Sequence, residues 1–141
     1  MVARLVLLFA LTVFGAGFSW AANGAADGSG PIHDIFSGTY FEYSGEVVGC
    51  SKGNGLMLDV GVDEKIYISG IGPQSYWEEV VLEYGVDRPT KGDYITVKGY
   101  TVEFILDEDE SEFVNIAMSV ITDGVEVPLR DPVTGDPLWL D

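Results

Sequence analysis

Short segments in which apolar and polar residues alternate, separated by glycine-containing turns, constrain the fold of this chain more than any other feature. In residues 40–48, Phe41, Tyr43 and Val47 alternate with polar or acidic neighbours. A period of two is typical of a strand with one buried face. Five further segments repeat the pattern, at residues 56–60, 65–69, 95–106, 114–120 and 125–129. We therefore predict a mainly β domain.

One window breaks the period of two. The apolar residues there have the spacing i, i+3, i+4 and i+7, and they are Trp77, Val80, Val81 and Tyr84. This spacing places them on one face of a helix. Pro73 suits the first helical turn and Gly85 suits the end. The spacing predicts one helix over about residues 73–84, between the third and fourth strands.

Two local signals refine the strands. The apolar parity switches at Gly99, from Ile95 and Val97 to the opposite parity beyond the glycine. Such a switch predicts a β-bulge or a sharp bend. Asp123-Gly124 is a typical two-residue hairpin turn, so we expect an extra hairpin at the C-terminal end of the domain.

The first 21 residues have the pattern of a secretory signal peptide. Arg4 is followed by an apolar stretch, and small residues precede a cleavage site between Ala21 and Ala22. A retained membrane anchor is the alternative, but the apolar run is short for a span of about 20 residues. We expect a periplasmic or secreted protein with no membrane attachment after cleavage.

The rest of the chain divides into two parts. Residues 22–37 are rich in glycine and small polar residues, which predicts a flexible leader whose Ile32, Ile35 and Phe36 begin to dock onto the domain. Residues 38–141 form one domain with a turn-rich C-terminal tail, since this length fits a single domain.

Charge and cysteine content exclude several classes of function. The chain carries 23 Asp and Glu against 7 Lys and Arg, a formal net charge of −16, and loss of Arg4 makes it −17. Nucleic-acid binding is not expected, because phosphate binding needs a basic groove. With one Cys and one His, neither an intramolecular disulfide nor a Cys-based or multi-His metal centre is possible.

The order of elements resembles the OB-fold, a five-stranded Greek-key barrel with its helix between the third and fourth strands. The glycine-rich first strand and the sequence Lys91-Gly92-Asp93-Tyr94-Ile95-Thr96-Val97 at the start of the fourth strand are similar to that family. Over residues 38–130 the chain resembles small secreted or periplasmic bacterial OB-fold proteins. Another small barrel, or an open sheet with one helix, is the alternative.

The resemblance implies a binding role and no catalytic residues. It implies a binding face on the second and third strands, bordered by the loops that follow the first and fourth strands. On this chain we expect a protein or a small ligand to be recognised, and the acidic charge favours a cationic protein or peptide at this face. The candidate residues are Met57, Asp59, Tyr67, Ser69, Asp107, Glu108, Asp109 and Glu110.

The acidic run at 107–112 was also compared with a calcium loop. Asp107, Asp109 and Ser111 match positions 1, 3 and 5, but positions 6 and 12 hold Glu112 and Met118 in place of Gly and Glu. The EF-hand motif therefore fails. Asp107, Asp109 and Glu112 remain weak candidates for a divalent cation, and a solvated loop is the plainer interpretation.

No motif for catalysis is present, and we predict neither an enzyme nor a cofactor. Cys50 lies near Lys52, which would favour a thiolate, but His33 in the leader is not placed to act as its base. An idle thiol and an intermolecular disulfide stay open for Cys50. An enzyme with an unseen cleft and a structural component of an envelope assembly are the rival functions.

The remaining aromatic and basic residues are expected to be structural. Trp77 and Trp139 are predicted to fill the core or cap one end of the domain, although Tyr76 beside them is also suited to line a ligand pocket. Arg88 and Arg130 each have an adjacent Asp in sequence, which favours ion pairs.

Overall fold

The described part of the structure begins after the predicted signal peptide. The computed structural model describes residues 28–32, 34–50, 55–105 and 107–140, without the side chain of Cys50. The predicted cleavage site at Ala21 and Ala22, the single histidine His33 and the predictions for the Cys50 thiol lie outside the described residues. No helix in the described ranges is long and apolar enough to cross a membrane.

Strands dominate the described residues. The elements are a 3₁₀ helix η1 (Ile35–Ser37), the strands β1 (Thr39–Cys50), β2 (Leu56–Gly61) and β3 (Glu64–Ser69), the helix α2 (Gln74–Tyr84), and the strands β4 (Tyr94–Ile105), β5 (Ser111–Thr122) and β6 (Val125–Pro128). The predicted mainly β class, with one α-helix between the third and fourth strands of this part, is confirmed. The alternation pattern did not predict η1.

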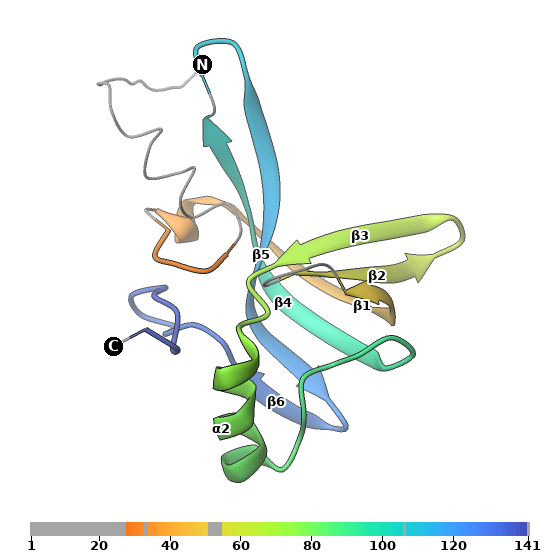
Figure 1. The fold of residues 1–141 in the computed structure, drawn as a ribbon. Coiled ribbons are helices and arrows are strands. Elements are labelled where there is room, and N and C mark those ends of the chain that lie inside the picture. Colours follow the sequence, from red (N-terminus) through yellow and green to blue (C-terminus); the bar gives the residue numbers. More distant parts are fainter. Residues whose placement is uncertain (1–27, 33, 51–54, 106, 141) are drawn as a thin grey trace.

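The strands form one sheet in the order β3-β2-β1-β4-β5-β6, and neighbours in this order are antiparallel (Figure 1). A short parallel pairing also joins β3 to β5, at Ile68 with Asn115 and Ser69 with Ile116. The expected five-stranded closed barrel with an extra hairpin is not confirmed. The described strands are six and make an open sheet, in which β6 pairs with β5 as the last hairpin.

The bulge predicted at Gly99 is present in the β4–β5 hairpin. Pairing between the two strands shifts register between Lys98 and Gly99. A Cβ at Gly99 would overlap the carbonyl oxygen of Ile116 and press on the ring of Phe41. Glycine is therefore required here, since the two backbones approach too closely for any side chain.

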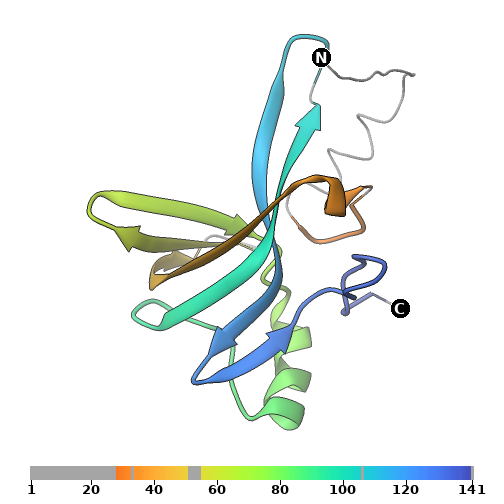
Figure 2. The same cartoon turned by 180° about the vertical axis from the view of Figure 1, so that it is seen from behind.

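Helix α2 confirms the period-3.6 window. It runs over Gln74–Tyr84 and ends at Gly85, whose φ of 76° is left-handed and whose N–H donates to the Val81 carbonyl at 3.0 Å. Trp77 and Val80 are its buried residues. The helix lies next to β6 at one end of the sheet in both views (Figure 1 and Figure 2).

Two hydrophobic clusters hold the sheet. The larger cluster has residues from all six strands and from α2, and it includes Val47, Leu58, Trp77 and Val97. The smaller lies on the β4–β5 hairpin, where Val102, Phe104, Val114 and Ile116 are covered by Ile32 and Ile35. Because of this cover, one face of the long hairpin is buried against the segment that precedes β1.

The described part of the predicted leader is held by the C-terminal tail, and the two segments lie side by side in Figure 2. Arg130, only 1% exposed, donates from Nη1 to the Gly135 carbonyl at 2.8 Å and from Nη2 to the Gly28 and Gly30 carbonyls at 2.9 and 3.0 Å. Trp139 Nε1 donates to the Ser29 carbonyl at 2.8 Å. Residues 28–30 are therefore packed against the domain.

Arg130 has the structural role that we expected, but its hydrogen bonds go to backbone carbonyls and not to the adjacent Asp131. The Asp131 carboxylate instead accepts from the backbone N–H groups of Val133 and Thr134, at 2.7 and 3.1 Å, and these bonds hold its pKa below the usual value. Burial lowers the pKa of the Arg130 guanidinium to about 10, so the side chain stays charged at neutral pH.

Candidate functional site

The β2–β3 hairpin forms one end of the predicted binding face. Its register places Met57 opposite Tyr67 and Asp59 opposite Lys65, so these four residues lie side by side as expected. Tyr67 is 41% exposed, and a Cβ at Gly55 would overlap its hydroxyl. The ring therefore extends over Gly55, and its exposed part offers an aromatic surface to a partner.

Ser69 does not belong to this face. Our expectation that it points outward is wrong, because its side chain is only 4% exposed. At the end of β3 the strand pairs with β5, and the backbone of Gly28 packs against Ser69 and Gly70. These long-range contacts bury a position that local alternation assigns to solvent.

Asn115 connects β3 to β5 at the point where the two strands meet. Its Nδ2 donates to the Tyr67 carbonyl at 3.1 Å, and its Oδ1 accepts from the Thr101 hydroxyl at 2.7 Å. The side chain therefore ties β3, β4 and β5 together. Asn115 was not predicted as a site residue, since a single amide in a strand carries no recognisable signal.

Phe113 is an exposed aromatic residue near the tip of the β4–β5 hairpin. It lies two residues before Asn115, on the same side of β5, and it is paired with Glu103 on β4. Its side chain is 70% exposed. The sequence analysis missed it, although an aromatic residue at the polar parity of the strand was a usable signal.

The acidic loop lies at the tip of this hairpin (Figure 1). Asp107, Glu108, Asp109 and Glu110 are all exposed, and Asp107 Oδ1 accepts from the Asp109 N–H at 2.8 Å. Asn115 lies four residues into β5, about 13 Å along the strand from Ser111, where the loop ends. The loop is therefore not beside Tyr67 and Met57 as expected, and Phe113 lies between them.

We call this surface the acidic strip. It comprises Tyr67, Glu103, Asp107–Glu110, Phe113 and Asn115. Residues 99–119 carry six carboxylates and no Lys or Arg. No Lys or Arg within this stretch offsets its negative charge, while Lys65 lies on the neighbouring β3 opposite Asp59.

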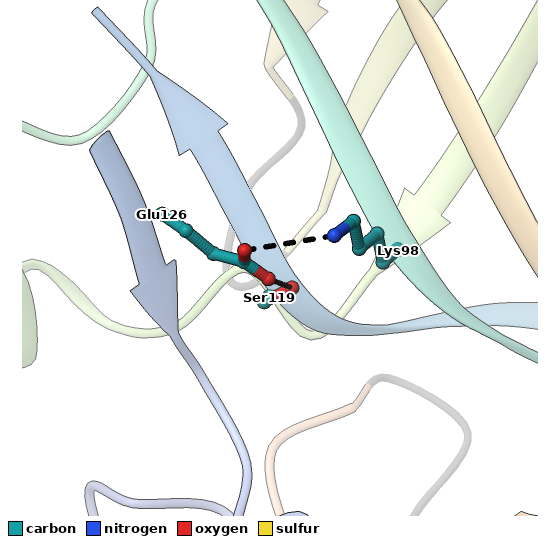
Figure 3. A network of polar contacts seen from close by, with 3 residues as sticks. All are labelled: Lys98, Ser119 and Glu126. Atoms are coloured by element: carbon teal, nitrogen blue, oxygen red, sulfur yellow. Dashed lines mark hydrogen bonds and ion pairs between the residues drawn. The ribbon is translucent and has the colours of Figure 1, made fainter. Parts of the chain in front are cut away.

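Lys98 lies on β4 at the end of the hairpin away from the acidic loop, and it forms an ion pair with Glu126 on β6. Figure 3 shows the contact: Nζ lies 3.5 Å from Glu126 Oε1, and the Ser119 hydroxyl donates to Glu126 Oε2 at 2.8 Å. An exposed pair of this kind contributes little to stability. It does place the nearest cation of β4 beside another carboxylate, away from the hairpin tip.

The described residues contain no group of three or more His, Cys, Asp or Glu side chains that is suited to hold a metal ion. Asp107, Asp109 and Glu112, the weak candidates from the sequence, are not brought together as such a group. In the structure the Asp107 carboxylate caps a turn in the loop. The acidic strip therefore offers a charged surface.

Tyr76 forms its contacts with other residues of the fold. Its hydroxyl donates to the Pro128 carbonyl at 2.6 Å, and its ring lies 5.7 Å from that of Trp139, centroid to centroid. Burial, followed by the nearby Tyr84, Glu83 and Glu79, raises the pKa of Tyr76 to about 12. These contacts fasten α2 to β6.

This pKa predicts a loss of stability in alkali. Between pH 10 and 12 the unfolded chain releases the Tyr76 proton while the folded chain keeps it, so the free energy of unfolding falls as pH rises. The contribution is fully present below pH 10. We expect Tyr76→Phe to flatten this fall in urea titrations across the window. An equal slope in both proteins would contradict the prediction.

Comparison with models of protein families, with curated protein sequences and with solved structures found no match to this chain. Functional inference therefore depends on the geometry and charge of the acidic strip.

Proposed function

We propose that this protein is an exported OB-like binding module that recognises a cationic protein or peptide through the acidic strip and performs no catalysis of its own. The observation that carries the proposal is the outer part of the β4–β5 hairpin, where residues 99–119 combine six carboxylates, no Lys or Arg, and an exposed Phe113. An aromatic centre with a charged rim is a common design of binding surfaces.

The strand pairing supports the OB-like part of the proposal. β1 pairs with both β2 and β4, α2 lies between β3 and β4, and the parallel contact of β3 with β5 brings the first five strands around toward a barrel. In that fold, strands 2 and 3 and the loop between strands 4 and 5 form the binding face. Tyr67 on β3 and the acidic loop between β4 and β5 belong to the corresponding elements of this chain, which supports their choice as binding residues.

Export is supported by the pattern of residues 1–21. If the signal peptide is removed, the mature protein begins at Ala22 in the periplasm or outside the cell. Intact-mass measurement of the exported protein tests this directly. Retention of residues 1–21 in a membrane fraction would contradict it.

The charge of the acidic loop is expected to control association. We expect the E108Q/D109N/E110Q variant to bind a cationic partner about tenfold more slowly at low salt, because steering by the hairpin's field is weakened. Asp107 is kept so that the turn stays capped. The measurement is surface-based kinetics at two salt concentrations, with basic proteins captured from the native envelope fraction as partners.

The matched control removes three exposed carboxylates from α2, as E78Q/E79Q/E83Q. Both variants change the net charge equally, so a specific role of the hairpin predicts slower association only for the loop variant. Equal kinetics for the two variants, or wild-type association without salt dependence, would place the binding surface elsewhere.

A further inference from the structure

The β5 strand has one edge that is only partly paired. Along this edge β5 pairs with β6 at Ser119–Thr122 and with β3 at Asn115 and Ile116. From Ser111 to Val114, no strand among the described residues pairs with it, although β4 pairs with the opposite edge throughout. Away from their short parallel pairing, β3 and the first part of β5 point in different directions in both views (Figure 1 and Figure 2).

This edge is held rigid by the structure around it. Val114 is buried in the smaller core cluster with Phe104, under Ile32 and Ile35. At the other end, the Asn115 amide fixes β5 to the Tyr67 carbonyl. A strand edge that is fixed in an extended conformation presents its backbone N–H and C=O groups with little further loss of entropy on binding.

The side chains along the edge set the chemistry of an added strand. Glu112 and Phe113 are both exposed and point to opposite faces of β5. A neighbouring strand would therefore place alternate residues beside a carboxylate and beside an aromatic ring. Basic residues suit the first position and apolar residues the second, because cross-strand pairs of these kinds are favourable.

We propose that the free edge of β5 at Ser111–Val114 binds an extended segment of the cationic partner by β-strand addition, and that this segment alternates basic and apolar residues. The inference rests on the proposed function, since it names the binding mode of the same surface. Charge complementarity favours a basic segment as the added strand, because residues 99–119 of the hairpin carry six carboxylates and no Lys or Arg. Main-chain hydrogen bonds would supply affinity and the alternate side chains specificity.

The probe for this mode is a short synthetic peptide in which valine and lysine alternate, with both ends blocked. Two further peptides carry N-methyl groups either on every valine or on every lysine. N–H groups of alternate residues face opposite edges of a strand, so one methylated peptide loses the bonds to β5 and the other keeps them. We expect at least one methylated peptide to bind about tenfold or more weakly.

Amide hydrogen exchange distinguishes strand addition from binding by charge attraction alone, because only strand addition forms hydrogen bonds to the β5 backbone. Binding of the unmethylated peptide should slow exchange of those amides in Ser111–Val114 that face the free edge. Amides of β6, such as those of Glu126 and Val127, serve as the internal reference. Glu112→Lys should weaken binding of the unmethylated peptide, whereas Glu79→Lys on α2, which is also exposed, should change the affinity much less.

The outcomes separate the two proposals. If all three peptides bind equally, or the unmethylated peptide does not bind or does not protect the β5 amides, strand addition is wrong. The proposed function is then judged by its own experiment, in which the loop variant and the α2 variant are compared with captured proteins. Loss of binding by either or both methylated peptides, together with protection at Ser111–Val114, supports strand addition.

Discussion

Replacing Trp77 by alanine is expected to lower the free energy of unfolding by about 3–5 kcal/mol, the usual cost of removing a large buried aromatic side chain. Trp77 is fully buried, and its indole N–H donates to the Ile71 carbonyl at 2.7 Å. It is the larger of the two buried residues of α2, the other being Val80.

Two further variants divide the Trp77 effect and control for it. Trp77→Phe keeps an aromatic ring but leaves the Ile71 carbonyl without this donor, so we expect an intermediate loss of about 1–3 kcal/mol. Leu82→Ala on the exposed side of the same helix should stay within about 0.5 kcal/mol, because Leu82 is 88% exposed. Urea denaturation followed by far-UV circular dichroism measures all three. A loss below about 1 kcal/mol for Trp77→Ala would contradict the packing described here.

The sequence predicted those elements whose signal is local. Strand positions followed from alternation because each strand buries one face, as Phe41 and Val47 of β1 do. Helix α2 followed from the spacing of its apolar residues, and the bulge at Gly99 from the change of parity. Each of these signals arises from residues within a few positions of one another, so no knowledge of distant partners was needed.

Features that depend on distant partners were predicted incorrectly or not at all. Ser69 has the parity of an exposed residue, but Ile116 and Gly28 bury it from segments far along the chain. The parallel contact of β3 with β5 has no local pattern either. Arg130 has an acidic neighbour in sequence, yet its partners Gly28 and Gly30 lie about a hundred residues away.

The binding face was predicted in part. The β2–β3 register correctly places Tyr67 beside Met57, since a short hairpin fixes its own pairing. The acidic loop was expected next to them, but β5 begins at Ser111, earlier than its apolar alternation suggests. The longer hairpin carries the loop away from Tyr67 and brings Phe113 onto the surface between them.

Replacing Arg130 by methionine is expected to release the segment that precedes η1 and to destabilise the protein by about 2–4 kcal/mol. Hydrogen bonds to a charged group typically contribute about 1.5–3 kcal/mol, and three are lost. The methionine variant also removes the cost of burying a charge, and the buried Nε that has no partner within the described structure. This relief limits the net loss but does not cancel it, because three carbonyls lose their donor.

Arg130→Lys distinguishes charge from shape. Lysine keeps the charge but replaces the planar guanidinium by one compact ammonium, which is poorly placed to reach carbonyls on both sides of Arg130 at once. We therefore expect nearly the same loss as for methionine. Trp139→Phe removes the bond to the Ser29 carbonyl and part of the ring that packs at Gly72, and it should cost about 1–2 kcal/mol.

The positions at which amide exchange rises in Arg130→Met show whether Arg130 holds the segment before η1 or supports the core as a whole. If Arg130 acts as a clamp on the preceding segment, amide exchange in Arg130→Met should rise first at residues 28–32 and next at Val102 and Val114, whose cluster includes Ile32 and Ile35. Amides of β1 and β2 should change only with global unfolding. Uniform acceleration of exchange across the sheet would show that Arg130 supports the whole core and not this segment in particular. Full stability of the lysine variant would show that the positive charge is sufficient. Either result would contradict a role of the three carbonyl bonds in holding this segment.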